Sequence, residues 1–175
     1  GYDTHSFLAT PDQLFADPDT GDFHLNPSGP AIDTGSALVD VAADLEGVPR
    51  PKGAGFDVGA YEYYEPIVSI TAADPYAYEK GPDQGTFTVG RTGSWSSPLV
   101  VKYHVGGTAE KGSDYKRLSG KVTLKAGSST ARIRVTPVDN AKEEGPETVK
   151  ITLKDNENYE VGLPKSAVVV IKDND

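Results

Sequence analysis

The feature that most constrains this fold is a series of short alternating strands that begins at Ile67. Val101 and Tyr103 fall on one side of such a strand, while Lys102 and His104 fall on the other. This alternation is typical of a sheet with one packed and one solvated face. The predicted strands are residues 67–73, 85–90, 98–105, 120–125, 130–137, 147–154 and 166–172. Seven strands in about 110 residues predict an all-β, immunoglobulin-like antiparallel sandwich.

Several classes of protein are excluded by composition. The chain has no Cys, which rules out disulfides, thiolate metal sites and a cysteine nucleophile. It has no apolar run of about 18 residues, so we expect no membrane insertion. It begins with Gly1 rather than Met, and we expect it to be a segment of a longer protein.

Charge divides the chain into two parts. Residues 1–65 carry a net charge of −10, and residues 66–175 carry +1. Such an asymmetry predicts two units of different kind, with the boundary at Glu65 and Pro66. The overall balance is acidic and no basic face is interleaved with aromatic residues, so we expect no nucleic-acid partner.

Residues 1–65 are rich in Pro, Gly and Asp, and their apolar runs are too short for a stable helix. Asp33 and Asp57 stand beside glycines, which favours turn roles over acid–base chemistry. The segments at 26–35, 43–51 and 55–63 resemble the carboxyl-terminal tail of secreted bacterial right-handed parallel β-helix proteins. The resemblance covers residues 20–65 and implies a loop-rich end-piece that closes an upstream β-helix of the same parent chain.

Strand direction sorts the acidic residues of the second unit. If each strand reverses the one before it, eleven of the fourteen Asp and Glu residues in 66–175 lie at or near one end of the sandwich. Two carboxylates about 5 Å apart repel by roughly 3 kcal/mol at an effective dielectric of about 20. Flexible oxygen-rich loops suit Ca²⁺, whereas the absence of Cys, and of His in these loops, argues against zinc and copper. The sequence therefore predicts calcium as the cofactor.

The same loops resemble the Calx-beta domain over residues 67–175. The resemblance rests on Tyr78-Glu79 and on the segments 107–115, 137–147 and 171–175. It implies an immunoglobulin-like sandwich that binds calcium ions at this end. By position, the candidate ligands are Glu79, Asp114, Asp139, Glu143, Glu147, Asp173 and Asp175. Asn140 and Asn174 stand where calcium-sensing members often have Asp, which implies fewer ions or weaker binding, with dissociation constants of about 10⁻⁴–10⁻³ M.

Two functions remain open. The first is a calcium-binding, non-catalytic accessory or adhesion module at the carboxyl end of a larger secreted or cell-surface bacterial β-helix protein. The second is a carbohydrate-binding accessory module of a polysaccharide lyase or glycoside hydrolase, with Trp95 as the candidate sugar-stacking residue. Extracellular polysaccharide and cell-surface components are the corresponding partners. We find no catalytic constellation, so we expect that this chain is not an enzyme.

Overall fold

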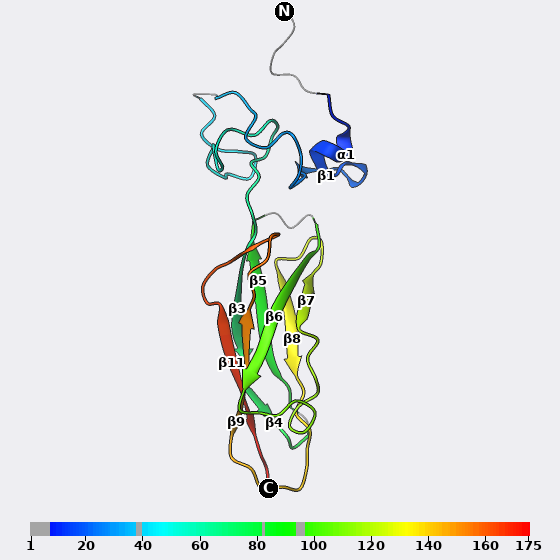
Figure 1. Ribbon diagram of the computed structural model, residues 1–175, viewed down its shortest axis with the longest axis vertical. Helices are drawn as coiled ribbons and strands as arrows, with labels where there is room; N and C mark the ends of the chain where they lie inside the picture. Colours follow the sequence, from blue (N-terminus) through cyan, green and yellow to red (C-terminus); the bar gives the residue numbers. More distant parts are fainter. Residues whose placement is uncertain (1–7, 38–39, 82, 94–96) are drawn as a thin grey trace, which may run out of the picture. The chain divides into compact units, whose positions relative to one another are not determined.

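The computed structural model describes residues 8–37, 40–81, 83–93 and 97–175. The chain forms two compact units, Gly1–Glu65 and Pro66–Asp175 (Figure 1). Each unit is described by itself below. Within the described ranges, no helix is long and apolar enough to cross a membrane.

The first unit contains little regular structure. A one-turn helix α1 (Pro11–Leu14) leads into β1 (Phe15–Asp17), a 3-10 turn η1 (Pro18–Thr20) and β2 (Asp22–Leu25). β1 and β2 form an antiparallel hairpin whose two phenylalanine rings, Phe15 and Phe23, meet edge to face at 5.3 Å. The remainder is loop, which agrees with the short apolar runs of the sequence.

Buried carboxylates hold these loops together. Asp57 accepts the backbone N–H of Asp33 at 2.7 Å and that of Tyr63. Glu62 accepts the backbone N–H groups of Lys52 and of Asp57. Buried backbone N–H groups that have no partner in a sheet need another acceptor. These acidic side chains supply it, as a neighbouring strand would in a sheet. Asp57 therefore has a structural role, but it joins segments that are distant in the sequence and does not close a local turn.

The predicted β-helix end-piece remains a prediction. The pairings found in the described part of the first unit are antiparallel: the β1–β2 hairpin and the isolated bridges Gly35–Phe56 and Ala43–Pro49. A parallel solenoid is built from stacked rungs that bury one another's faces. Those rungs would have to come from the parent chain.

The second unit is the predicted all-β sandwich. One sheet has the strand order β10-β3-β5-β8 and the other β4-β11-β9-β6-β7. The strands are β3 (Ile67–Asp74), β4 (Tyr76–Tyr78), β5 (Gly85–Thr92), β6 (Leu99–Gly107), β7 (Lys121–Leu124), β8 (Thr130–Val135), β9 (Glu147–Leu153), β10 (Glu160–Val161) and β11 (Ser166–Lys172). Buried aliphatic side chains from both sheets, with Phe87 and Tyr159, fill the space between them.

The described part of this unit has two strands more than the seven predicted, and Pro75 explains one of them. β3 pairs with β5 in the first sheet, whereas β4 pairs with β11 in the second. Proline has no N–H and cannot continue a central ladder, so the chain leaves one sheet at Pro75 and joins the other at Tyr76. The other additional strand, β10, has only two residues and pairs with β3. Two residues are too few to show an alternation of apolar and polar side chains in the sequence.

Strand direction follows the predicted alternation. β5 runs antiparallel to both β3 and β8, and β9 runs antiparallel to both β6 and β11. β4 continues in the direction of β3 and lies parallel to β11. The ends of β4, β6 and β11 and the start of β9 therefore lie at one end of the sandwich, where Figure 1 also places the C-terminus. This is the end to which the acidic loops were assigned.

Candidate calcium site

The loop that carries Asp114 is fixed where it leaves β6. Gly107 has a φ of 117°, and a Cβ there would lie 2.0 Å from the carbonyl oxygen of Thr148. Only glycine fits both constraints. Beyond it, Thr108 and Thr148 exchange hydrogen bonds, each hydroxyl accepting the other residue's backbone N–H at 2.8–3.0 Å. The loop is thereby held against the start of β9, beside Glu147.

Asp114 closes a tight turn within this loop. Its backbone N–H donates to the carbonyl of Glu110 at 3.0 Å, while its Oδ2 accepts the backbone N–H of Glu110. The carbonyl of Asp114 accepts the N–H of Val138 at 2.9 Å, which joins the loop to the segment after β8. Asp114 is 5% exposed. One of its carboxylate oxygens serves the turn, and the other is left for a second partner.

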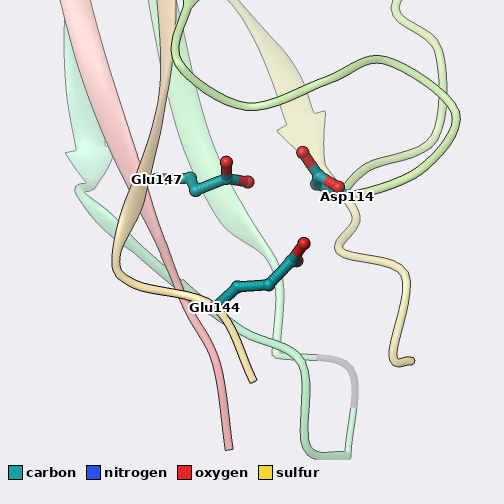
Figure 2. Close-up of side chains that lie close together, drawn as sticks. All are labelled: Asp114, Glu144 and Glu147. Atoms are coloured by element: carbon teal, nitrogen blue, oxygen red, sulfur yellow. The ribbon is translucent and has the colours of Figure 1, made fainter. Parts of the chain in front are cut away.

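Three carboxyl groups converge at this point. Asp114, Glu144 and Glu147 each offer an oxygen, and these oxygens lie within 4.8 Å of one another (Figure 2). The three residues come from the β6–β7 connection, the β8–β9 connection and the start of β9. Lys142 forms an exposed ion pair of 2.5 Å with Glu144 at the outer edge.

The crowding of negative charge changes the pKa of Glu147. Burial, a side-chain hydrogen bond with Asp114 and repulsion from Asp114 and Glu144 raise this pKa to about 7. A proton shared between two carboxyl groups relieves repulsion that a cation would otherwise relieve. A proton and a metal ion would therefore compete for the same oxygens.

Glu79 lies just after β4 and is 2% exposed. Its Oε2 is buried and has no hydrogen-bond partner within the described part of the chain. Burial raises the pKa of Glu79, and the nearby charges of Asp173, Glu144 and Asp139 raise it further, against a backbone hydrogen bond from Asn140. A buried carboxylate oxygen without a donor is costly unless a proton or a cation occupies it.

Asp173 follows β11 and organises the neighbouring backbone. Its Oδ2 accepts the N–H of Glu144 at 2.6 Å, and its Oδ1 accepts the N–H groups of Asn174 and Asp175. These hydrogen bonds lower the pKa of Asp173 and keep it ionised. We call the set of Glu79, Asp114, Glu144, Glu147 and Asp173 the carboxylate rim.

Not every predicted ligand lies in this rim. Asp139 is exposed, although its charge still acts on Glu79. Glu143 and Asp175 are exposed as well. The hydrogen bonds of Asp175 are made with its neighbours in the sequence, Asp173 and Asn174. In place of Glu143, the structure brings the adjacent Glu144 inward. The sequence offers two consecutive glutamates in a turn, and only the backbone path determines which of them faces the cluster.

The donors of the rim fit a hard divalent cation. All are carboxylate oxygens from loops and from the start of a strand, which suit Ca²⁺, and the described rim has no His nitrogen that would favour zinc. The partnerless Oε2 of Glu79 and the proton needed by Glu147 are both satisfied by added positive charge. The residues present therefore fit calcium.

The predicted sugar-stacking residue Trp95 lies outside the described residues. His104 is exposed on β6, as its place in the alternation predicts.

The fold and the rim together define an immunoglobulin-like sandwich with a carboxylate site at one end. The family model of the Calx-beta domain matches residues 65–175. The chain belongs to the Calx-beta family, as the sequence predicted. Calx-beta is a non-catalytic domain, in agreement with the expectation that this chain is not an enzyme.

Solved structures share this fold. The Apo-form Calx CBD1 domain superposes with a TM-score of 0.54 at 24% identity, covering 64% of this chain and all of that one. The calcium binding domain CBD12 of CALX1.1 has a TM-score of 0.52 at 25% identity, covering 62% of this chain and 44% of that one. CBD12 from CALX1.2 has a TM-score of 0.52 at 24% identity. No curated protein matches the chain.

Proposed function

We propose that residues 66–175 bind Ca²⁺ at the carboxylate rim. The observation that carries this is the buried Oε2 of Glu79, which has no partner among the described residues and lies among further carboxylates. Asp114, Glu144 and Glu147 supply a second group of oxygens at the same end. The relative named as a calcium binding domain supports the same assignment.

Bound calcium would stabilise the end of the sandwich. It would neutralise repulsion between loops that belong to different strands, so the folded state would gain free energy from the ion. Asn140 and Asn174 leave the segments around the site with less charge than Asp would give. We therefore expect dissociation constants of about 10⁻⁴–10⁻³ M, typical of extracellular modules.

A thermal titration tests this proposal. The melting temperature of the full chain should rise in CaCl₂ relative to EDTA, and Asp114→Ala should abolish the rise. Asp155→Ala, which changes an exposed carboxylate at the opposite end, is the matched control and should keep it. A wild-type melting temperature that does not respond to millimolar calcium would overturn the proposal.

We further propose that the chain belongs to a larger secreted or cell-surface bacterial protein. In it, the first unit would close a parallel β-helix and the second would be an accessory or adhesion module. The resemblance of residues 20–65 to β-helix tails supports this role. The coding sequence upstream of Gly1 tests it: solenoid rungs are expected, and an unrelated fold would contradict it. Any enzymatic activity of the parent would belong to those rungs.

A further inference from the structure

The outer face of the five-stranded sheet carries positive charge without any negative charge. Side chains alternate across a strand, so the inward positions are those buried in the core and the others face solvent. The outward positions of the five strands hold the lysines Lys102, Lys121, Lys150 and Lys172 and no Asp or Glu. The whole chain has a net charge of −9, so this face is opposite in sign to the protein that carries it.

Strand register places these lysines on a diagonal. Lys102 and Lys121 are direct partners on β6 and β7. Lys150 on β9 stands opposite Gly106, four residues further along β6 than Lys102. Lys172 on β11 is four residues beyond Val168, the partner of Lys150. Strand geometry then makes the stripe about 28 Å long from Lys102 to Lys172, with about 14 Å from Lys102 to Lys150 and from Lys150 to Lys172. The Cα atoms of the direct partners Lys102 and Lys121 are only about 5 Å apart.

The charges of the stripe are not neutralised within the described parts of the chain. The ion pairs found there involve His24, Arg50 and Lys142, and none involves a lysine of the stripe. Directly opposed like charges, such as Lys102 and Lys121, destabilise a sheet. An external anion would remove that cost.

Two tyrosines end the stripe. The ammonium group of Lys172 lies over the rings of Tyr76 and Tyr78, 4.5 Å and 5.5 Å from their centres. Both tyrosines stay exposed, at 44% and 39%. The outward positions beside Lys150 on β9 are Thr148 and Thr152, and the exposed His104 of β6 stands opposite Thr152. The face thus combines cations, hydroxyl groups and flat aromatic surfaces.

We propose that this lysine stripe binds an anionic polysaccharide, whose sugar rings carry carboxylate or sulfate groups. Tyrosine rings present an apolar face against which a sugar ring packs, and hydroxyl groups suit a ligand rich in hydroxyls. Lysine is depleted at protein–protein interfaces, which disfavours a protein partner. Duplex DNA carries one charge per about 1.7 Å, far denser than the spacing of this stripe. A polysaccharide whose charges are spaced by whole sugar rings matches it better than a duplex does.

The sequence alone does not reveal this face. The four lysines are scattered over more than 70 residues and lie on four different strands. Only the sheet register brings them to one surface, next to Tyr76 and Tyr78.

Affinity electrophoresis of the full chain tests the proposal. Gels would contain polygalacturonate or its fully methyl-esterified, uncharged form, and dextran sulfate or plain dextran. All runs would contain EDTA, so the result is independent of the calcium site. Retardation is expected with polygalacturonate, dextran sulfate or both, and the pair distinguishes carboxylate from sulfate. The uncharged polymers should give none.

Matched variants locate the surface. Lys102→Gln/Lys150→Gln should weaken binding about tenfold, as expected for the loss of two exposed ion pairs. Arg132→Gln/Arg134→Gln removes the same charge from exposed positions of β8 in the other sheet and should leave binding unchanged. Should the first pair lower the melting temperature, Lys121→Gln/Lys172→Gln replaces it.

Three results would overturn the proposal. The first is no retardation of the wild type by either charged polysaccharide. The second is an equal loss of binding in the Arg132→Gln/Arg134→Gln variant, which would mean that binding depends on the net charge of the protein and not on this face. The third is equally strong retardation by polyglutamate or duplex DNA, which would mean that the face does not select polysaccharide.

Discussion

The backbone N–H of Glu144 donates a 2.6 Å hydrogen bond to Oδ2 of Asp173, and this contact joins the β8–β9 connection to the end of the chain. Glu144 is also one of the three converging carboxylates. Asp173 therefore influences the site in two ways, as a charge beside Glu79 and as the acceptor that positions Glu144.

Asp173→Ala should consequently reduce the calcium-dependent rise in melting temperature more than the loss of one exposed carboxylate would. Asp175→Ala removes an exposed carboxylate two residues away and serves as the control. Calorimetric melting with and without calcium measures both. Equal effects of the two variants would contradict the positioning role of Asp173.

The adjacent glutamates give a sharper comparison. Glu144→Gln should weaken calcium binding by roughly tenfold, since a charge next to Asp114 and Glu147 is lost. Glu143→Gln should leave binding nearly unchanged, because Glu143 is exposed. Calcium titration of the two variants decides between them. A larger effect at Glu143 would favour the ligand set predicted from the sequence.

This difference shows how far the sequence alone could go. Alternation from Val101 to Tyr103 was enough to predict a strand and its inward face. Side chains in a strand point to one of two faces in turn, so the apolar residues identify the face that is buried. The Glu143 and Glu144 pair lies in an irregular turn, where no period applies. Pro75 separates β3 from β4, but the transfer of β4 to the other sheet depends on contacts with β11, which no local pattern predicts.

Acid should stabilise the calcium-free protein. The pKa of Glu147 is about 7 in the folded state against an ordinary value of 4.5, so the folded state holds more protons between these pH values. The contribution of Glu147 to the free energy of unfolding is therefore present at low pH and is lost as pH rises from about 4.5 to about 7. Urea unfolding in EDTA across this range measures the effect.

Glu147→Gln should flatten this pH dependence, because the amide does not titrate. The difference between wild type and variant isolates Glu147 from the other carboxylates. A wild-type curve that rises with pH relative to the variant would contradict the expected sign. Calcium should remove the loss near neutral pH, since the ion replaces the proton.

His24 predicts a trend of the same direction for the first unit, at a pH above its ordinary pKa of 6.5. Its Nδ1 lies 2.6 Å from Asp22 and its Nε2 lies 3.1 Å from Glu46. Burial alone would lower the pKa of His24, but the hydrogen bonds to Asp22 and Glu46 outweigh it and raise the pKa above 6.5. The stabilisation is therefore complete below about pH 6.5 and is lost as pH rises through the folded pKa.

An NMR titration of the imidazole protons measures the pKa of His24 directly. Glu46→Gln should lower it, because an amide does not stabilise the imidazolium as a carboxylate does. Glu65→Gln changes a different carboxylate of the same unit and should leave it unchanged. A wild-type pKa below 6.5 would contradict the geometry.

Tyr159 should be important for the stability of the sandwich. It is 1% exposed, and its hydroxyl accepts the N–H of Lys102 at 3.0 Å and donates to the carbonyl of Lys154 at 2.8 Å. Tyr159→Phe leaves both backbone groups without that partner and should cost about 1–3 kcal/mol. Tyr76→Phe, at an exposed ring, should cost less than about 0.5 kcal/mol. Urea unfolding compares the two, and equal losses would contradict this role.

Calorimetric titration of the full chain with CaCl₂ near neutral pH tests the central claim most directly. We predict saturable binding with a dissociation constant of about 10⁻⁴–10⁻³ M, lost in Asp114→Asn/Glu147→Gln and kept in Asp155→Asn. The absence of saturable binding by the wild type up to about 10 mM calcium, ten times the weakest value expected, would contradict it.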